Sequence, residues 1–436
     1  MTQPATQNPD ALLSRELGTR QLAAGIFNYV VGSGIFALPG IAMGMLGPAA
    51  PLAYIACAVL MGLVVLCFAE AGSRVSVSGG PYAYVEVALG PFVGFIAGAL
   101  NYLTQIAATS AVTAFFAASV ARLVGAEGSR TFLVATVIGT LASLAWVNIR
   151  GVRTGARVLE VVTVAKLLPL IAFVLIGVFF INSGNLAWTT VPSVKETLGA
   201  VGLLIFAFAG IEGALVPSGE VKDPNRTVPR AAFLALGLVT VLYVAVHLVA
   251  QGILGAELAN DKVTPLATAT SRFAGSVGFT LMVITASISM LGHTSGAILA
   301  TPRMLLAFGR DGFIPRWFAS VHPAYRTPHL AIVFHATVLA GVALSGTFVQ
   351  LAILANVAVL SLYLLCATAA GVLWRRDVRQ SGEPFKAPGG PLVPILASIA
   401  IAWLLWATVT KREFIALGSV VGLAVVMYWI RKVRTT

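Results

Sequence analysis

Long runs of apolar residues follow one another along the whole chain, with short polar stretches between them. A helix of about 20 apolar residues crosses the hydrocarbon core of a bilayer. Because the runs are spread over the full length, they cannot all belong to one buried core and instead predict many membrane spans. The expected spans are residues 21–46, 50–71, 91–121, 131–148, 156–181, 197–217, 230–252, 274–306, 329–346, 349–374, 391–409 and 414–430. The predicted fold class is an all-α membrane protein with twelve transmembrane helices.

Composition and charge support this picture. Of 436 residues, 58% are hydrophobic and 10% are charged, whereas a soluble domain has about 45–50% apolar and about 25% charged residues. The formal net charge of +12 does not indicate nucleic-acid binding, because the charges separate hydrophobic spans and form no basic stripe. The three cysteines, Cys57, Cys67 and Cys366, fall inside apolar runs. Neither a disulfide framework nor a metal site is expected from that placement.

Lysine and arginine are unevenly divided between the two sides of the predicted bundle. Most of the 28 lie in loops on the side of the N-terminus, and the positive-inside rule makes this side the cytoplasm. Both termini are therefore expected in the cytoplasm, with the protein in the inner or plasma membrane. Residues 1–19 are polar, and the apolar stretch after them has no cleavage pattern of a signal peptide, so they are expected to form a cytoplasmic tail.

Two loops have compositions that indicate ordered structure. Residues 310–328 contain prolines around an aromatic pair and predict a short helix at the cytoplasmic membrane interface. Residues 375–390 are charged and rich in proline and glycine, which is typical of a linker. This linker is expected to join a transport core of ten helices, residues 20–374, to a last pair of helices and a cytoplasmic C-terminus in residues 391–436.

The first span carries a weak helical position at Gly32-Ser33-Gly34. Each glycine weakens a helix by about 1 kcal/mol relative to alanine, and Pro39 removes a further backbone donor. A break at this depth would offer free amides and a partial positive charge to an anion such as a carboxylate. Glycines at this spacing also let two helices pack closely, and spacing alone does not decide between the two interpretations.

A second weak position lies in the sixth span, where glycines flank Ile211 and the acidic Glu212. Spans separated by an odd number of crossings enter the membrane from opposite sides. Interrupted helices at corresponding positions of two such halves are typical of inverted-repeat transporters with a binding site at the membrane midplane. The halves are expected at about residues 20–181 and 197–374, although no residue-level repeat supports them.

Two ionisable residues lie inside predicted spans, where charge is costly. Lys166 lies too deep in the fifth span for its ammonium to reach the interface easily, so it is a candidate carrier of a coupling proton. Alternatively, it is a fixed cation that ties its helix to carbonyls at a helix break. Glu212 also has two interpretations, a titrating group or an acceptor for free amides. His247, His293 and His335 are single histidines within spans and are expected in the core or along a pore.

Four motifs in order resemble those of the amino acid–polyamine–organocation (APC) transporters. The first is VGSGIFALPG at residues 31–40, and the second is SGGPYAY at residues 78–84. The third combines FAFAGIE at residues 206–212 with GEVKDPNRTVPR at residues 219–230. The fourth consists of Pro302-Arg303, GRDGFIP at residues 309–315 and Thr327-Pro328. The resemblance implies the LeuT-type fold, in which helices 1–5 and 6–10 are inverted repeats and helices 1 and 6 are interrupted.

The resemblance also implies a substrate site at the two interruptions. The backbone amides of Ser33, Gly34 and Ile35 and the Ser33 hydroxyl would hold a substrate carboxylate. Carbonyls of Val30, Phe206 and Ala209 would accept hydrogen bonds from the substrate ammonium. Phe206 would act as an aromatic gate, and Ala209, where relatives often carry a larger aliphatic residue, would leave a roomier pocket. The set of expected substrate-binding residues is Val30, Gly32, Ser33, Gly34, Ile35, Phe206, Ala207, Ala209 and Gly210.

The same resemblance implies which ion is coupled to transport and which partners the protein binds. Lys166 matches a lysine that occupies the position of a sodium ion in proton-coupled relatives, which implies coupling to a proton and not to sodium, with no other cofactor. The loop at residues 122–130 lacks the cysteine that attaches an accessory glycoprotein in one branch of the family. A monomer or homodimer without a disulfide-linked subunit is therefore expected, with the lipid bilayer and a small-molecule substrate as its partners and no nucleic acid.

The function predicted is secondary active transport of neutral L-amino acids by alternating access, coupled to protons or in exchange for another amino acid. The alternative within transport is an exchanger of cationic amino acids or polyamines, which the shortage of acidic residues near the two breaks disfavours. A channel would need a repeated filter or a ring of like residues. A membrane-embedded enzyme would need a nucleophile–base pair or an H-E-x-x-H motif. The sequence contains neither pattern, so the protein is not expected to be an enzyme.

Overall fold

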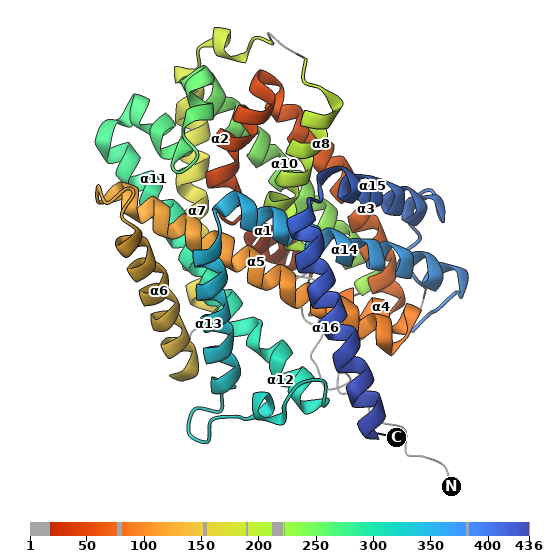
Figure 1. Ribbon diagram of the computed structural model, residues 1–436. Helices are drawn as coiled ribbons and strands as arrows, with labels where there is room; N and C mark the ends of the chain where they lie inside the picture. Colours follow the sequence, from red (N-terminus) through yellow and green to blue (C-terminus); the bar gives the residue numbers. More distant parts are fainter. Residues whose placement is uncertain are drawn as a thin grey trace.

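The computed structural model describes residues 18–75, 81–150, 155–188, 191–211, 221, 223–380 and 383–435. Within these ranges every regular element is a helix (Figure 1). The predicted all-α class is therefore confirmed.

The helices lie close to the ranges that hydrophobicity predicts. In the first part of the chain they are α1 (Thr19–Val30), α2 (Gly34–Leu46), α3 (Ala50–Arg74), α4 (Pro81–Leu89), α5 (Pro91–Leu123), α6 (Arg130–Arg150), α7 (Gly155–Gly177) and α8 (Val194–Phe208). In the second part they are α10 (Pro224–Leu254), α11 (Pro265–Ala300), α12 (Pro302–Arg310), α13 (His329–Ser345), α14 (Phe348–Arg375), α15 (Leu392–Thr408) and α16 (Lys411–Thr435). Short 3₁₀ turns are η2 (Gly47–Ala49), η3 (Val178–Phe180), η4 (Ser183–Leu186), η6 (Gly255–Asn260) and η7 (Arg316–Ala319).

Many of these helices can cross a membrane. By length and composition, seven segments of the described chain are long and apolar enough, namely Gly34–Arg74, Pro91–Leu123, Arg130–Arg150, Asn225–Asn260, Pro265–Arg310, Phe348–Arg375 and Lys411–Val433. Three shorter apolar helices, Val164–Phe180, His329–Ser345 and Leu392–Thr408, accompany them. The chain is a multi-pass membrane protein.

The expected span at residues 274–306 lies within the apolar helical segment Pro265–Arg310. Within that segment α11 is kinked at Gly275, which has a φ of 60° and a ψ of −153°, and α12 follows α11 after Thr301. The short interfacial helix expected at residues 310–328 is only the 3₁₀ turn η7. The length of this turn is limited by Gly312 before it, which has a left-handed φ of 79°, and by the neighbouring prolines.

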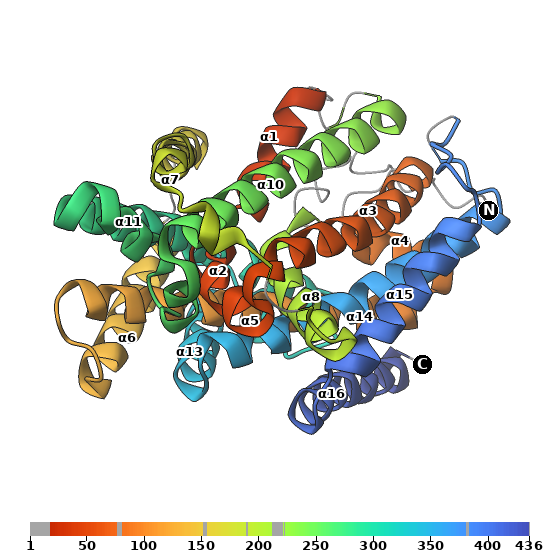
Figure 2. The same cartoon turned by 90° about the horizontal axis from the view of Figure 1, so that it is seen from above.

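The helices form a bundle in which α5 runs obliquely through the middle (Figure 1). On one side, α1, α10 and α3 pack side by side (Figure 2), and α2 and α8 contact each other behind them. On the other side, α11 and α13 pack against α5, and α6 packs against α13. Helix α14 contacts both α5 and α3, so it joins the two groups. Helices α15 and α16 lie at the periphery against α14.

The loop after α10 covers α2 on the side where α2 ends. Gly40 of α2 leaves room for this loop, because a Cβ there would lie 2.1 Å from the carbonyl oxygen of Asp261. The Asp261 carboxylate accepts backbone N–H groups from Val263 and Thr264 at 3.0 and 2.8 Å. It also pairs with Arg122 at the end of α5, with 3.3 Å between Nη2 and Oδ2. These contacts hold the loop against both groups of helices.

The linker between α14 and α15 is fastened to the end of α3. Arg74 is 2% exposed, and its guanidinium pairs with Glu70 at 3.1 Å and with Asp377 of the linker at 3.5 Å. The same guanidinium donates to the carbonyl of Val378 at 3.3 Å. The Ser73 hydroxyl accepts the backbone N–H of Phe385 at 2.9 Å. The described residues of the predicted linker, 375–380 and 383–390, therefore contact the end of α3.

Replacing Arg74 by methionine is expected to lower the free energy of unfolding by about 3–5 kcal/mol, because the carboxylate of Glu70 loses its buried partner. Thermal unfolding of the purified protein in detergent measures the change. Arg379→Met is the matched control, because Arg379 pairs with Asp377 on the surface, where both side chains are about half exposed. Equal unfolding temperatures for the two variants would contradict a stabilising role of the buried cluster.

Candidate functional site

The first helix is interrupted where glycine and serine make it weak. Helix α1 ends at Val30 and α2 begins at Gly34, and residues 31–33 between them are not helical. The carbonyls released at the end of α1 find partners on other helices. The Lys166 ammonium of α7 donates to the carbonyl oxygens of Asn28 and Val31, each at 2.6 Å. The Lys166 side chain, from a helix much later in the sequence, thus stabilises the break between α1 and α2.

Helix α8 ends at a second irregular position. Ala209 is extended, with a ψ of 150°, and Gly210 has a φ of 116°, a conformation that favours glycine. The absence of a side chain at Gly210 also lets the ring of Tyr29 approach, because a Cβ there would lie 2.9 Å from Tyr29 Cδ1. The end of α8 and the end of α1 are therefore in direct contact.

Two further contacts join the interrupted segments. The Tyr243 hydroxyl of α10 donates its proton between the carbonyls of Ala207, at 2.8 Å, and Val30, at 3.1 Å. Gly34, the first residue of α2, packs directly on α8, because a Cβ there would lie 2.8 Å from Ala207 Cα. Both contacts are buried and leave no room for a larger side chain at Gly34.

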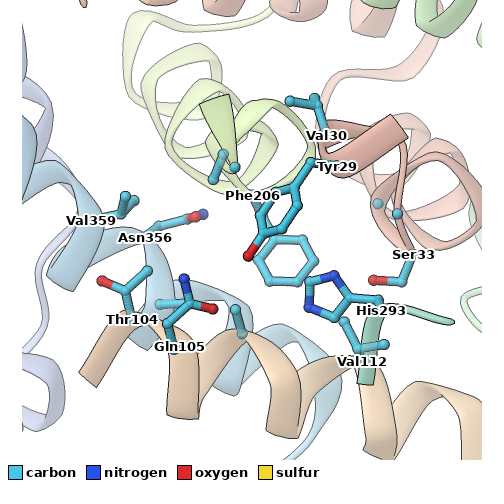
Figure 3. Close-up of a pocket in the computed structure, with 16 residues that line it drawn as sticks. Tyr29, Val30, Ser33, Thr104, Gln105, Val112, Phe206, His293, Asn356 and Val359 are labelled. Carbon is cyan, nitrogen blue, oxygen red and sulfur yellow. The ribbon is translucent and has the colours of Figure 1, made fainter. Parts of the chain in front are cut away.

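A small cavity of about 50 Å³ lies between these segments (Figure 3). It is lined by residues of α1, the two irregular segments, α5, α11 and α14. The lining residues are Tyr29, Val30, Gly32, Ser33, Gly34, Thr104, Gln105, Ala108, Val112, Phe206, Ala209, Gly210, His293, Ala355, Asn356 and Val359.

Most of the residues expected in the site line this cavity. They are Val30, Gly32, Ser33, Gly34, Phe206, Ala209 and Gly210. Ile35 is buried beside the cavity, and Ala207 packs against Gly34. Glu212 lies outside the described residues, so its two interpretations stay open.

The backbone gives the cavity opposite polarities at two places. At the start of α2, the amides of Gly34 and Ile35 precede the first intrahelical hydrogen bond, which Phe36 donates to the Ser33 carbonyl at 3.0 Å. The Ser33 hydroxyl is 1% exposed and has no partner among the described residues. The ends of α1 and α8 instead present carbonyl oxygens. The site can therefore receive an anionic group at α2 and a cationic group at the ends of α1 and α8.

Lys166 lies behind the cavity wall and is 5% exposed. Within the described part of the chain no carboxylate pairs with it, and its ammonium is balanced by carbonyls at the C-terminal end of α1, where the helix dipole is negative. The structure thus places Lys166 in the bracing position that the sequence allowed. Its capacity to carry a proton stays a prediction.

Several residues of the site were missed by the sequence interpretation. Tyr243 bridges the two breaks, and Thr104, Gln105 and Asn356 line the far wall of the cavity. A usable signal existed, because polar side chains inside apolar spans usually face a bundle interior or a cavity. His293 lines the cavity, in agreement with its expected position in the core or along a pore.

The other two histidines are away from the cavity. His247 is fully buried, with its ring 5.3 Å from that of Tyr54, and His335 lies 3.4 Å from the hydroxyl of Tyr102. In the described ranges no group of three or more histidine, cysteine, aspartate or glutamate side chains could hold a metal ion.

Different side chains border the two ends of the cavity. Phe206, in the last turn of α8, packs edge-on against Phe348 at the start of α14, with 5.4 Å between the ring centroids, and Phe115 packs against Phe348 in turn. On the side of α1, the cavity is bordered by Tyr29, which is 39% exposed. The Phe206–Phe348 pair therefore covers the cavity on one side, and the partly exposed Tyr29 borders it on the side of α1.

Comparison with known proteins identifies similar chains over the full length. A family model described as amino acid permease matches residues 17–430. The methylthioribose transporter of Bacillus subtilis is 28% identical, over 96% of this chain and 94% of that protein. The branched-chain amino acid permease BcaP of the same organism is 25% identical, over 98% and 96%. Its serine/threonine exchanger SteT is 27% identical, over 94% and 95%.

Proposed function

Because the chain belongs to the amino acid permease family, we propose that it transports neutral L-amino acids across the membrane by alternating access. Transport is coupled to protons or to the counterflow of another amino acid. One observation carries this proposal: the residues at the start of α2, where helix amides are free, and those at the ends of α1 and α8, where helix carbonyls end, line the same cavity. An α-amino acid has a carboxylate and an ammonium on one carbon, which matches these two polarities.

The charge of the cavity favours a neutral substrate over a cationic one. Among the described lining residues there is no aspartate, glutamate, lysine or arginine. A charged side chain would lose its hydration there without gaining an ion pair, which is costly. This argues against the cationic amino acids and polyamines that the sequence left as an alternative.

Coupling to a proton rests on the position of Lys166. Its ammonium donates hydrogen bonds to the carbonyls of Asn28 and Val31 at the break of the first helix. Loss of the charge would weaken both hydrogen bonds and alter the break that binds the substrate. Sodium has no role in this proposal, because the ammonium already occupies the carbonyls at this place.

The proposal of alternating access rests on the side-chain contacts at the two ends of the cavity. We assign the LeuT-type arrangement of two inverted five-helix repeats, with both termini in the cytoplasm. In that arrangement the side of α1, where Tyr29 is 39% exposed, faces the cytoplasm. The outward path is closed by Phe206 on Phe348 and by the Arg122–Asp261 pair, and these contacts would separate when the site opens outward. A monomer or homodimer suffices for this cycle.

Purified protein in proteoliposomes is expected to take up or exchange at least one neutral L-amino acid, with uptake increased by an inward proton gradient. Radiolabelled neutral and cationic amino acids, a polyamine and methylthioribose form the test panel, each measured with and without a pH gradient or internal substrate. Empty liposomes are the control. Uptake of methylthioribose alone, or of cationic compounds alone, would contradict the proposed substrate class.

A further inference from the structure

The wall of the cavity opposite Ser33 carries a cluster of uncharged polar side chains. Thr104 and Gln105 of α5 and Asn356 of α14, here called the polar wall, gather on one side, whereas Ser33 and His293 lie on the other (Figure 3). If the substrate carboxylate lies at Ser33, the substrate side chain reaches toward the polar wall. The chemistry of this wall therefore bears on which neutral amino acid is accepted.

Asn356 supplies a hydrogen-bond acceptor, its side-chain oxygen, to the polar wall. Its amide nitrogen donates to the carbonyls of Gly202 and Leu203 of α8, at 2.8 and 3.1 Å, which fixes the orientation of the amide. The side-chain oxygen has no partner among the described residues, although Asn356 is only 3% exposed. A buried acceptor without a partner is costly, and a ligand that donates a hydrogen bond removes the cost.

Gln105 adds both donor and acceptor capacity. It lines the cavity and makes no hydrogen bond within the described part of the chain. The Thr104 hydroxyl, in contrast, donates to the carbonyl of Leu100 at 2.9 Å and can still accept. The polar wall thus offers an amide group and two acceptors at the place where a substrate side chain ends.

We propose that the substrate side chain is uncharged and forms hydrogen bonds, as a small hydroxyl or carboxamide does. An apolar side chain of the same size would leave Asn356 and Gln105 without partners in a closed site, and a site built in this way rejects an analogue that lacks the polar group. A charged side chain would find no opposite charge among the described lining residues. This inference rests on the proposed function and narrows it to polar neutral amino acids.

Isosteric pairs of amino acids test the inference in wild-type proteoliposomes. Threonine and valine differ by a hydroxyl in place of a methyl group, and asparagine and leucine have similar shapes. Uptake measured for each labelled compound is expected to favour the polar member of each pair by about tenfold or more. The variant Gln105→Leu, which keeps the size of the side chain, is expected to reduce this preference to about threefold or less.

Thr113→Val serves as the control, because Thr113 lies on α5, does not line the cavity and donates only within its own helix, to the carbonyl of Thr109. It is expected to keep the wild-type preference. Valine and leucine taken up as well as their polar partners by the wild-type protein would overturn the inference and leave the proposed function standing. An unchanged preference in Gln105→Leu would also overturn it. Absence of uptake for all four amino acids, with uptake of another neutral amino acid, would overturn the inference alone, whereas failure of every neutral amino acid would remove the proposed function itself.

Discussion

Uptake driven by a proton gradient is expected to fall to the level of empty liposomes when Lys166 is replaced by alanine. The substitution removes two hydrogen bonds of 2.6 Å from the carbonyls of Asn28 and Val31. A buried hydrogen bond to a charged group contributes about 1.5–3 kcal/mol, so the break of the first helix loses its brace together with the proposed proton carrier. Uptake of a labelled neutral amino acid, with and without the gradient, measures the effect.

Tyr243→Phe separates bracing from proton coupling. It removes hydrogen bonds to Val30 and Ala207 at the same breaks without removing a charge. A net loss of about 0.5–1.5 kcal/mol is expected, with slower transport that still responds to the gradient. If Lys166→Ala kept its full dependence on the proton gradient, Lys166 would be a structural brace only. Counterflow assays without a gradient add a second criterion, because a defect limited to coupling spares exchange.

Gly34→Ala is expected to have a similarly large effect through packing. The added methyl group would lie 2.8 Å from Ala207 Cα and 2.9 Å from Ala207 Cβ, so α2 and α8 must separate. Overpacking of a buried contact costs about 1–3 kcal/mol. The amide of Gly34 would also move away from the substrate carboxylate, and a misplacement of about 1 Å can reduce a rate by about 100-fold. Binding and uptake of a labelled substrate measure the loss.

Gly44→Ala is the matched control for this variant. Gly44 lies on the same helix, and its nearest neighbours would be 3.8 and 3.9 Å from the new Cβ, which is ordinary contact. Uptake by this variant is expected to equal that of the wild type, and the unfolding temperatures of the two glycine variants show whether the fold survives. Normal binding by Gly34→Ala would mean that the close contact of α2 with α8 is dispensable for the site.

The interruption of the first helix could be predicted because its causes are local. Glycine and serine at residues 32–34 destabilise the helix whatever surrounds them, and α1 and α2 indeed meet at this place. Lys166 could be singled out for a similar reason, since a lysine inside an apolar span needs a partner. Which partner it has was open, and the carbonyls of Asn28 and Val31 became known only from the structure.

By itself, the sequence determined the all-α class, the approximate limits of the helices and the weak position of the first helix at residues 32–34. These features depend on the hydrophobicity and backbone freedom of neighbouring residues. The tertiary structure alone decided that Tyr243 bridges both breaks and that Gln105 and Asn356 face Ser33 across one cavity. Contacts of this kind depend on how distant helices rotate and cross, and no local pattern encodes that geometry.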